Sequence, residues 1–255
     1  MTSNDRWHKG MYDNWFASET IGSPKFHKLA QWEASFLVNA LGLKRGQRIL
    51  DVPCGTGRHS AVFAAHGLEV TGVDINEPCL ALARKACRGK SVTLRTGDMS
   101  KLSRYRGQFD AVANLFTSFG YFSTDQKNEQ VLQEMISTLK PGGRIALHLV
   151  NRDWLLKVFQ PTDWRDEKGK FVLEARKYDS ATKYNEARMV VVDQKSGKAK
   201  VYRHQTRLYS KSEIVAMMSR CGLKDIRVFG NFDGGPYRKF ESTHPIYIGR
   251  KPLSE

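Results

Sequence analysis

The residues of this chain that are best placed to do chemistry are carboxylates that follow apolar runs. Asp51 ends one such run and precedes a turn that contains Gly55 and Gly57. Glycines in a turn of this kind let the backbone approach a ligand closely. Ser60 stands where a dinucleotide-binding motif has its third glycine, and no Gly-Lys-Ser/Thr follows, so the turn matches neither that motif nor a phosphate-binding P-loop. A tight turn that binds no ligand is the alternative.

Two further apolar runs also end in carboxylates, Asp74 and Asp98. A carboxylate at the tip of the second strand is placed to accept hydrogen bonds from a ribose diol. Residues 109–116 and 145–150 form a fourth and a fifth run. Each run alone is compatible with an ordinary buried strand that ends in a polar cap. Five in order, separated by segments with helical periodicity, predict an α/β fold with a doubly wound parallel sheet.

Apolar residues recur at helical spacing in four segments around these runs. A doubly wound sheet binds ligands beyond the carboxyl ends of its strands, where the strand order reverses. We therefore expect the polar residues at the strand ends to meet at one edge of the sheet. The predicted helices are residues 24–41, 76–88, 125–139 and 213–221.

This order of motifs resembles that of the class I S-adenosylmethionine-dependent methyltransferases. Asp51-x-x-x-Gly55-x-Gly57 matches the first motif of that family, which surrounds the methionine part of the cofactor. The resemblance is close over residues 48–150 and resumes after Ser210. It implies a Rossmann-like methyltransferase sheet and S-adenosylmethionine as cofactor. The cofactor-binding residues that it implies are Asp51, Gly55, Gly57, Asp74, Ile75, Asp98, Met99, Asn114 and Leu115.

The domain organisation predicted from these patterns has three parts. Residues 1–47 form an N-terminal helical cap, residues 48–151 and 210–255 form the cofactor-binding core, and residues 152–209 form an insertion. Similar enzymes close an N-terminal segment over the cofactor, which makes Tyr12 a further predicted cofactor contact. Docking of the N-terminal aromatic residues onto the domain is the alternative.

The insertion has strand-like patterns that predict a small antiparallel sheet. Because it leaves the fifth strand at its carboxyl end, we expect it at the edge of the sheet where ligands bind. A substrate lid and a dimer contact are the two uses considered, and the lid is favoured. The expected strands are residues 170–175, 187–192 and 200–209.

The segment after Asn114 gives a hint about the substrate. Methyltransferases that act on nucleobase amines often have Asn/Asp-Pro-Pro-Tyr/Phe here, whereas this chain has Ser-Phe-Gly-Tyr at residues 118–121. That version resembles glycine N-methyltransferase-like and antibiotic-tailoring enzymes. Packing of both aromatic residues at the strand–helix junction is the alternative. The predicted substrate-binding residues are Phe119, Tyr121, Asn151, Arg152 and Tyr237, and no single catalytic base can be named among the nearby histidines and acids.

Composition sets further limits. The 255 residues are 40% hydrophobic and carry a net charge of +15. Residues 152–212 hold 15 Lys/Arg against 8 Asp/Glu, which fits a solvated sheet face, contact with an anionic small molecule, or contact with nucleic acid. The four cysteines lack metal or disulfide spacing, and neither a signal peptide nor an apolar run of membrane-spanning length is recognisable. We expect a cytoplasmic, metal-free monomer or homodimer.

These observations predict methyl transfer from S-adenosylmethionine to a nitrogen or oxygen of a small molecule, with anionic molecules among the candidates. An RNA methyltransferase is the alternative enzyme. A cofactor-binding regulator without turnover is the alternative from another class. Nucleic acid is expected to bind only non-specifically, through the net charge.

Overall fold

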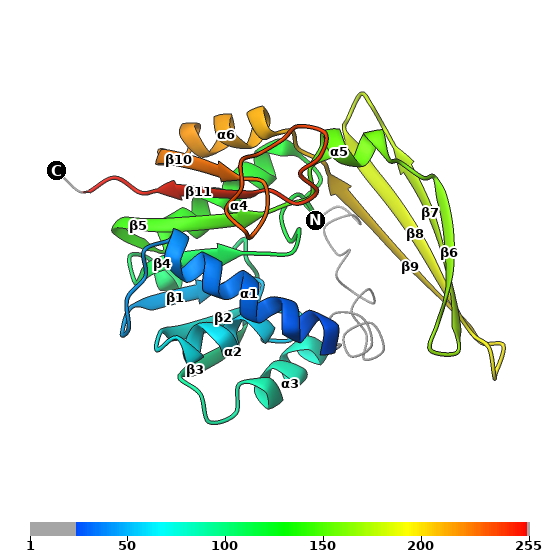
Figure 1. The fold of residues 1–255 in the computed structure, drawn as a ribbon, viewed down its shortest axis with the longest axis horizontal. Coiled ribbons are helices and arrows are strands. Elements are labelled where there is room, and N and C mark those ends of the chain that lie inside the picture. Colours follow the sequence, from blue (N-terminus) through cyan, green and yellow to red (C-terminus); the bar gives the residue numbers. More distant parts are fainter. Residues whose placement is uncertain (1–23, 254–255) are drawn as a thin grey trace.

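A seven-stranded sheet forms the centre of the molecule in the computed structural model, which describes residues 24–253 (Figure 1). The strands lie in the order β10-β11-β5-β4-β1-β2-β3. β11 runs antiparallel to both of its neighbours, and the other adjacent pairs are parallel. Their bounds are β1 (Arg48–Asp51), β2 (Glu69–Asp74), β3 (Val92–Thr96), β4 (Phe109–Asn114), β5 (Leu139–His148), β10 (Lys224–Phe229) and β11 (Ile246–Arg250). The predicted α/β sheet is confirmed.

The order of the strands reverses between β1 and β4. β2 and β3 continue from β1 on one side, and β4 returns to pair with β1 on the other, with Ile49 opposite Ala111 and Asp51 opposite Ala113. Ligands of doubly wound sheets bind at such a reversal, beyond the carboxyl ends of the strands. Asp51 and Asn114 end these two strands, so the fold brings both of them to that point.

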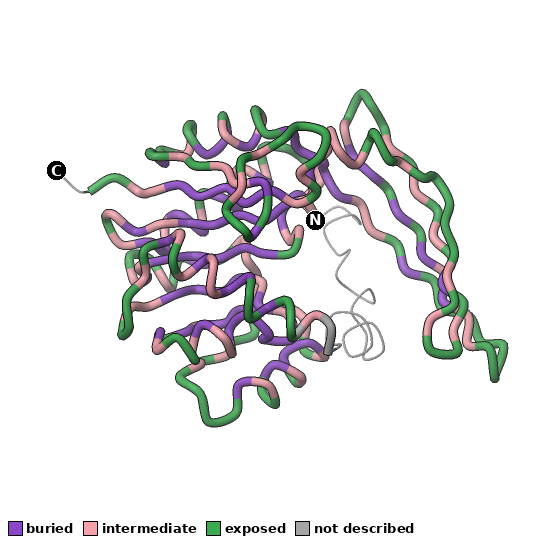
Figure 2. The backbone as a smooth tube through the Cα atoms, in the orientation of Figure 1, coloured by how far each residue is buried: buried purple, intermediate pink, exposed green. Residues whose placement is uncertain are grey.

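Helices cover both faces of the sheet, because its strands are apolar on both sides (Figures 1 and 2). Leu50 packs in the core cluster with α4 and α6, while its neighbour Ile49 packs in the cluster with α1 and α2. Side chains of successive strand residues point to opposite faces, which accounts for this alternation. The helices are α1 (Pro24–Ala40), α2 (Arg58–Ala65), α3 (Glu77–Ala86), α4 (Asp125–Ser137), α5 (Arg152–Lys157) and α6 (Lys211–Arg220), with a short 3-10 helix η3 (Ser103–Tyr105).

Polar caps explain where the predicted helices begin. Asn76 accepts a hydrogen bond from the amide of Cys79 at 3.0 Å, and Thr124 caps α4 in the same way. Ser210 and Glu213 form a reciprocal capping box at the start of α6. Such caps satisfy amide groups that have no partner within the helix.

The insertion folds as a four-stranded antiparallel sheet that projects from the core (Figure 1). Three of its strands match the predicted runs, but β6 was not expected because its sequence, TDWRDE, is almost entirely polar. One face carries buried residues such as Val172 and Tyr202, while Trp164 and Leu173 are exposed on the other face. The strands are β6 (Thr162–Glu167), β7 (Lys170–Tyr178), β8 (Tyr184–Asp193) and β9 (Ala199–Arg207).

Some predictions fall outside what the structure describes or concern absences. Tyr12 and the other N-terminal aromatic residues lie outside residues 24–253, so the contact predicted for Tyr12 stays a prediction. Within that range, none of the helices combines the length and the apolar character that crossing a membrane requires. All four cysteines are free thiols.

Candidate functional site

A direct hydrogen bond joins the ends of β1 and β4. The side-chain amide of Asn114 donates to the carbonyl oxygen of Val52 at 2.8 Å. Its side-chain oxygen, also buried, has no hydrogen-bond partner within residues 24–253. A buried amide oxygen without a partner is costly, so such an atom points to a ligand or water that is bound there in use.

Asp51 lies beside this bond and is almost completely buried. The Ser60 hydroxyl donates to its carboxylate at 2.5 Å. Burial raises the pKa of Asp51 to about 7, and the nearby carboxylate of Asp74 adds to the rise, against the effect of the Ser60 hydrogen bond. Ser60, at the position where a dinucleotide-binding motif has its third glycine, thus binds Asp51.

Asp74 orders the glycine-rich turn from the end of β2. Its two carboxylate oxygens accept hydrogen bonds from the amides of Gly55, at 2.7 Å, and Asn76, at 2.8 Å. Burial raises the pKa of this carboxyl group, and the two amides oppose the rise. Each oxygen keeps a second lone pair, so the carboxylate can still accept hydrogen bonds from a diol.

Gly57 permits close packing where the turn enters α2. Its φ is 73°, and a Cβ there would lie 2.9 Å from the Cβ of Ala83 and 3.1 Å from the Sγ of Cys87. A side chain would therefore force α2 and α3 apart. The glycine matters for both the turn and the position of the two helices.

Within residues 24–253, the remaining residues predicted to bind the cofactor lie around the ends of β2, β3 and β4. Asp98 accepts hydrogen bonds from the amide and the hydroxyl of Ser100, at 2.8 and 2.7 Å. Ile75 is exposed at the tip of β2, whereas Met99 packs partly against the core. The amide of Gly97 donates to the carbonyl of Asp74 at 2.9 Å, which links the two strand ends. Leu115, predicted at the end of β4, is buried in the core.

The chain after β4 has an unusual backbone. Phe116 and Thr117 both have positive φ, 59° and 55°. The amide of Phe116 donates to Nδ1 of His148 at 3.2 Å, and the amide of Thr117 donates to the His148 carbonyl at 2.9 Å. Left-handed backbone at two consecutive non-glycine residues is strained, and such strain gathers at functional sites.

Phe119 and Tyr121, both predicted to bind substrate, differ in their surroundings. Phe119 is 2% exposed, and its ring lies 5.8 Å from that of Tyr209 in the core. This packing does not favour the predicted substrate contact. Tyr121 lies 6.3 Å, between ring centroids, from His204 of β9. It therefore faces the insertion.

Backbone contacts hold the insertion against the segment that contains Tyr121. The amide of Arg207 donates to the carbonyl of Gly120 at 2.8 Å, and the hydroxyl of Tyr184 donates to the carbonyl of Phe122 at 2.6 Å. A Cβ at Gly120 would lie 2.6 Å from the Arg207 carbonyl oxygen, so only glycine allows this approach. The base of β8 and β9 thus adjoins the segment after β4.

The other three predicted substrate-binding residues are brought together, but their side chains have structural partners. Asn151 donates to the carbonyls of Lys239 and Ser242, at 2.7 and 2.8 Å, and caps α5. The Tyr237 hydroxyl lies 3.3 Å from the Asn151 side-chain oxygen. Arg152 forms an ion pair with Glu213 at 2.6 Å. Substrate contact by these residues stays a prediction.

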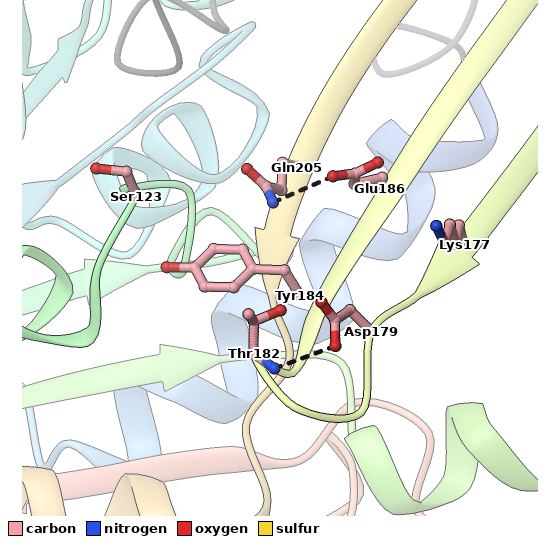
Figure 3. A pocket seen from close by; sticks show the side chains of 7 residues that line it. All are labelled: Ser123, Lys177, Asp179, Thr182, Tyr184, Glu186 and Gln205. Atoms are coloured by element: carbon pink, nitrogen blue, oxygen red, sulfur yellow. Dashed lines mark hydrogen bonds between the residues drawn. The ribbon is translucent and has the colours of Figure 1, made fainter. Parts of the chain in front are cut away.

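A polar cavity of about 240 Å³ lies at the junction of the insertion and the core (Figure 3). Tyr184 of β8 enters it beside Thr182 and Gln205, and Ser123 approaches from the segment before α4. Among residues 24–253, none of the predicted cofactor-binding residues lines it. The lining residues are Ser123, Lys177, Asp179, Thr182, Tyr184, Glu186 and Gln205.

Two groups near the ends of β1 and β4 were not predicted. His59 and Glu33 form a buried hydrogen bond of 2.6 Å, and burial lowers the pKa of His59, against the effect of the Glu33 carboxylate. Arg58, at the start of α2, lies over the ring of Phe116 with 4.2 Å from Cζ to the centroid. Sequence reasoning could have found Arg58, because it is a basic residue that directly follows the glycine turn.

The chemistry of this region suits S-adenosylmethionine. Buried carboxylates, Asp51 and Asp74, complement a sulfonium and an ammonium group, and Asn114 offers an unpaired buried oxygen. The turn at Gly55 and Gly57 leaves backbone accessible to a ligand. No group of three or more histidine, cysteine or acidic side chains suited to a metal ion occurs within residues 24–253.

Comparison with known proteins agrees with this geometry. Residues 49–143 match the family model of the methyltransferase domain. The chain is 33% identical over 131 residues to glycine/sarcosine N-methyltransferase of Parasynechococcus marenigrum, an alignment that covers 50% of this chain and 46% of that protein. The chain spans about half the length, or less, of the curated relatives it matches.

Two solved structures share the fold over most of their length. The CcbJ methyltransferase of Streptomyces caelestis has a TM-score of 0.78 and 20% identity, and the match covers 95% of this chain and 100% of that one. CalS10 of Micromonospora echinaspora, an amino pentose methyltransferase solved with S-adenosylmethionine, has a TM-score of 0.67 and 23% identity. That match covers 94% of this chain and 97% of the other.

Proposed function

We propose that this chain, whose residues 49–143 match the family model of the methyltransferase domain, transfers a methyl group from S-adenosylmethionine to a nitrogen or oxygen of a small molecule. The observation that carries the proposal is the convergence of Asp51, Asp74 and Asn114 at the point where the strand order reverses. When bound, S-adenosylmethionine supplies an electrophilic methyl group on a sulfonium. CalS10 of similar fold, solved with this molecule, supports the choice of cofactor.

The residues of this chain have mainly to bind the cofactor and the acceptor, to orient them toward each other, and to exclude water. Transfer of a sulfonium methyl group is an in-line displacement that depends on holding the nucleophile near attack distance. Hydrogen bonds hold two backbone segments in place beside the strand ends. One is the turn between Asp51 and Gly57, and the other is the Phe116–Thr117 segment. A neutral amine needs no strong base before attack, whereas a hydroxyl group usually does.

Two observations favour a small molecule as the acceptor. Ser-Phe-Gly-Tyr follows Leu115-Phe116-Thr117, without the Pro-Pro of nucleobase amine methyltransferases. The insertion adjoins this segment through the Arg207–Gly120 and Tyr184–Phe122 hydrogen bonds, which suits a lid over the acceptor. The similarity to glycine/sarcosine N-methyltransferase, over about half of each chain, supports the same class of substrate.

Calorimetric titration with S-adenosylhomocysteine tests the cofactor assignment. Asp74→Asn keeps the shape of the side chain but removes its charge, and we expect it to weaken binding about 10- to 100-fold, the range for hydrogen bonds to charged groups. Glu77→Gln is the matched control, because Glu77 is an exposed carboxylate at the start of the adjoining α3. Equal affinity of wild type and Asp74→Asn would contradict the ribose assignment.

Turnover is tested by a metabolite screen that follows release of S-adenosylhomocysteine. Release with a small acceptor supports the proposal. Binding of the cofactor without release for any acceptor class, including RNA, would favour the regulator instead. Release only with RNA would favour the RNA enzyme.

A further inference from the structure

The guanidinium of Arg58 is buried, and one of its donor atoms has no hydrogen-bond partner. Arg58 is 6% exposed, and its Nη1 atom has no hydrogen-bond partner among residues 24–253. Buried arginines are ordinarily paired with a carboxylate, because an unpaired buried charge is costly. No ion pair of Arg58 occurs within the described part of the chain.

The two nearby carboxylates are already engaged elsewhere. Glu33 and Asp51 are the acidic groups whose charge acts on Arg58. Glu33 accepts a hydrogen bond from His59 at 2.6 Å, and Asp51 accepts one from Ser60 at 2.5 Å. These carboxylates partly offset the positive charge of Arg58, but they accept no hydrogen bond from its Nη1 atom.

Aromatic rings fix the position of the guanidinium. Its Cζ lies 4.2 Å from the ring centroid of Phe116 and 5.0 Å from that of Phe26. Phe116 follows the end of β4, and Arg58 directly follows Gly57 of the glycine turn. The cation therefore stands between the turn and the strained segment after β4, at the edge where the predicted ligand residues converge. Stacking on aromatic faces leaves the edge of a guanidinium available for hydrogen bonds.

We propose that Arg58 binds a carboxylate of a ligand held at this edge. This inference rests on the proposed function and deepens it. A carboxylate matches the planar fork of guanidinium donors and would complete the pairing of a buried charge. Two sources of this chemistry exist: the amino-acid part of S-adenosylmethionine, and an acceptor that is itself a carboxylic acid.

The first arm of the test compares S-adenosylhomocysteine with 5′-methylthioadenosine, which lacks the amino-acid carboxylate. If the cofactor is the source, Arg58→Gln should weaken S-adenosylhomocysteine binding about 10- to 100-fold and leave methylthioadenosine affinity unchanged. Arg58→Lys keeps the positive charge but not the planar fork of donors, so it should lose less S-adenosylhomocysteine affinity than Arg58→Gln. Arg104→Gln is the matched control, since Arg104 also lies over an aromatic ring, Tyr105, but precedes β4 at the opposite edge of the sheet.

The second arm uses acetate as the probe of an acceptor carboxylate. If the acceptor is the source, Arg58→Gln should keep its affinity for both nucleosides. Ligand-observed NMR at constant ionic strength should then detect acetate binding to the S-adenosylhomocysteine complex of the wild type but not of the variant. Normal methylthioadenosine binding also shows that the variant is folded.

Three results would overturn the inference. Equal losses for both nucleosides in Arg58→Gln would assign Arg58 a structural role, as would unchanged nucleoside affinities with no difference in acetate binding. A similar loss in Arg104→Gln would indicate a general effect of charge. Failure of the cofactor assignment is distinguishable, because the wild-type protein would then bind neither nucleoside. Failure of methyl transfer alone is also distinguishable, because it leaves nucleoside binding intact and is read from the absence of S-adenosylhomocysteine release in the metabolite screen.

Discussion

His148 holds Phe116 through a hydrogen bond from the Phe116 amide to Nδ1 of the imidazole, 3.2 Å long. Because Nδ1 accepts, a neutral His148 carries its proton on Nε2. Burial lowers its pKa well below the usual range, and the neighbouring His244, His59 and Arg58 add to this effect. The imidazole of His148 thus holds the start of the segment after β4, because its Nδ1 accepts the hydrogen bond of the Phe116 amide.

His148→Leu should release this segment, whereas His148→Asn should retain it. The side-chain oxygen of asparagine can stand close to the position of Nδ1 and accept the same hydrogen bond, which leucine cannot do. We expect His148→Leu to lower the free energy of unfolding by about 1 kcal/mol more than His148→Asn, the usual worth of one hydrogen bond. Denaturant titration measures the difference.

Amide hydrogen exchange at Phe116 and Thr117 provides the second readout for these variants. Exchange should accelerate in His148→Leu and stay slow in His148→Asn. Equal exchange in both variants would mean that the left-handed conformation does not depend on the imidazole.

Asp51→Asn should stabilise the ligand-free protein at pH 8. Burial raises the folded pKa of Asp51 to about 7, above the ordinary value of about 3.9 in an unfolded chain. The contribution of Asp51 to the free energy of unfolding is therefore highest in acid, where the carboxyl group is protonated. It falls as the pH rises from about 4 to about 7. Three pKa units correspond to at most about 4 kcal/mol.

Thermal unfolding of wild type and Asp51→Asn at pH 8 and pH 5 checks this expectation. The asparagine can still accept from Ser60, so the comparison isolates the charge. The variant should unfold at a higher temperature at pH 8, by about 2–4 °C for each kcal/mol, and the gain should shrink at pH 5. A lower Tm at both values would show that the ionised carboxylate is favoured in the fold.

The sequence was sufficient to predict the central sheet and the meeting of Asp51 with Asn114. Apolar runs of strand length alternate with helical periodicity, and the rules of crossover connections then determine which strand ends meet. Helix caps such as Asn76 were equally readable, because they act within a few residues. β6 was not, because the polar sequence of this edge strand hides its alternation.

Contacts between distant residues explain what the sequence did not reveal at the site. Asn151 satisfies the carbonyls of Lys239 and Ser242, far along the chain, and no local pattern announces such a role. The burial of Phe119 depends on Tyr209. Arg58 stood next to a recognised motif, but its setting between Phe26 and Phe116 follows only from the tertiary fold.

Replacing residues 162–205 with a short Gly/Ser linker tests the insertion as a lid. Thr206 to Tyr209 are kept, because Arg207 forms ion pairs with Asp125 and Glu213 and Tyr209 packs in the core. We expect affinity for S-adenosylhomocysteine to stay within about threefold, since the residues predicted to bind it lie on other elements, and methyl transfer to be lost.

Sedimentation of the same variant separates a lid from a dimer contact. A lid predicts an unchanged number of chains per particle in solution together with lost transfer. Dissociation of a dimer into single chains with surviving activity would instead assign the insertion to a subunit interface.

The basic insertion should bind RNA only weakly, and no methyl group should enter RNA. Several of its cations are already paired within the sheet: Arg165 with Glu174, Lys170 with Asp193, and Arg176 with Glu174. The remaining positive charge attracts polynucleotides without regard to sequence, and counterion release makes such binding fall steeply between low and physiological salt. Incubation of bulk RNA with methyl-labelled cofactor, beside filter binding at several salt concentrations, measures both effects. Stoichiometric label at a defined nucleotide would establish the RNA enzyme and remove the small-molecule proposal.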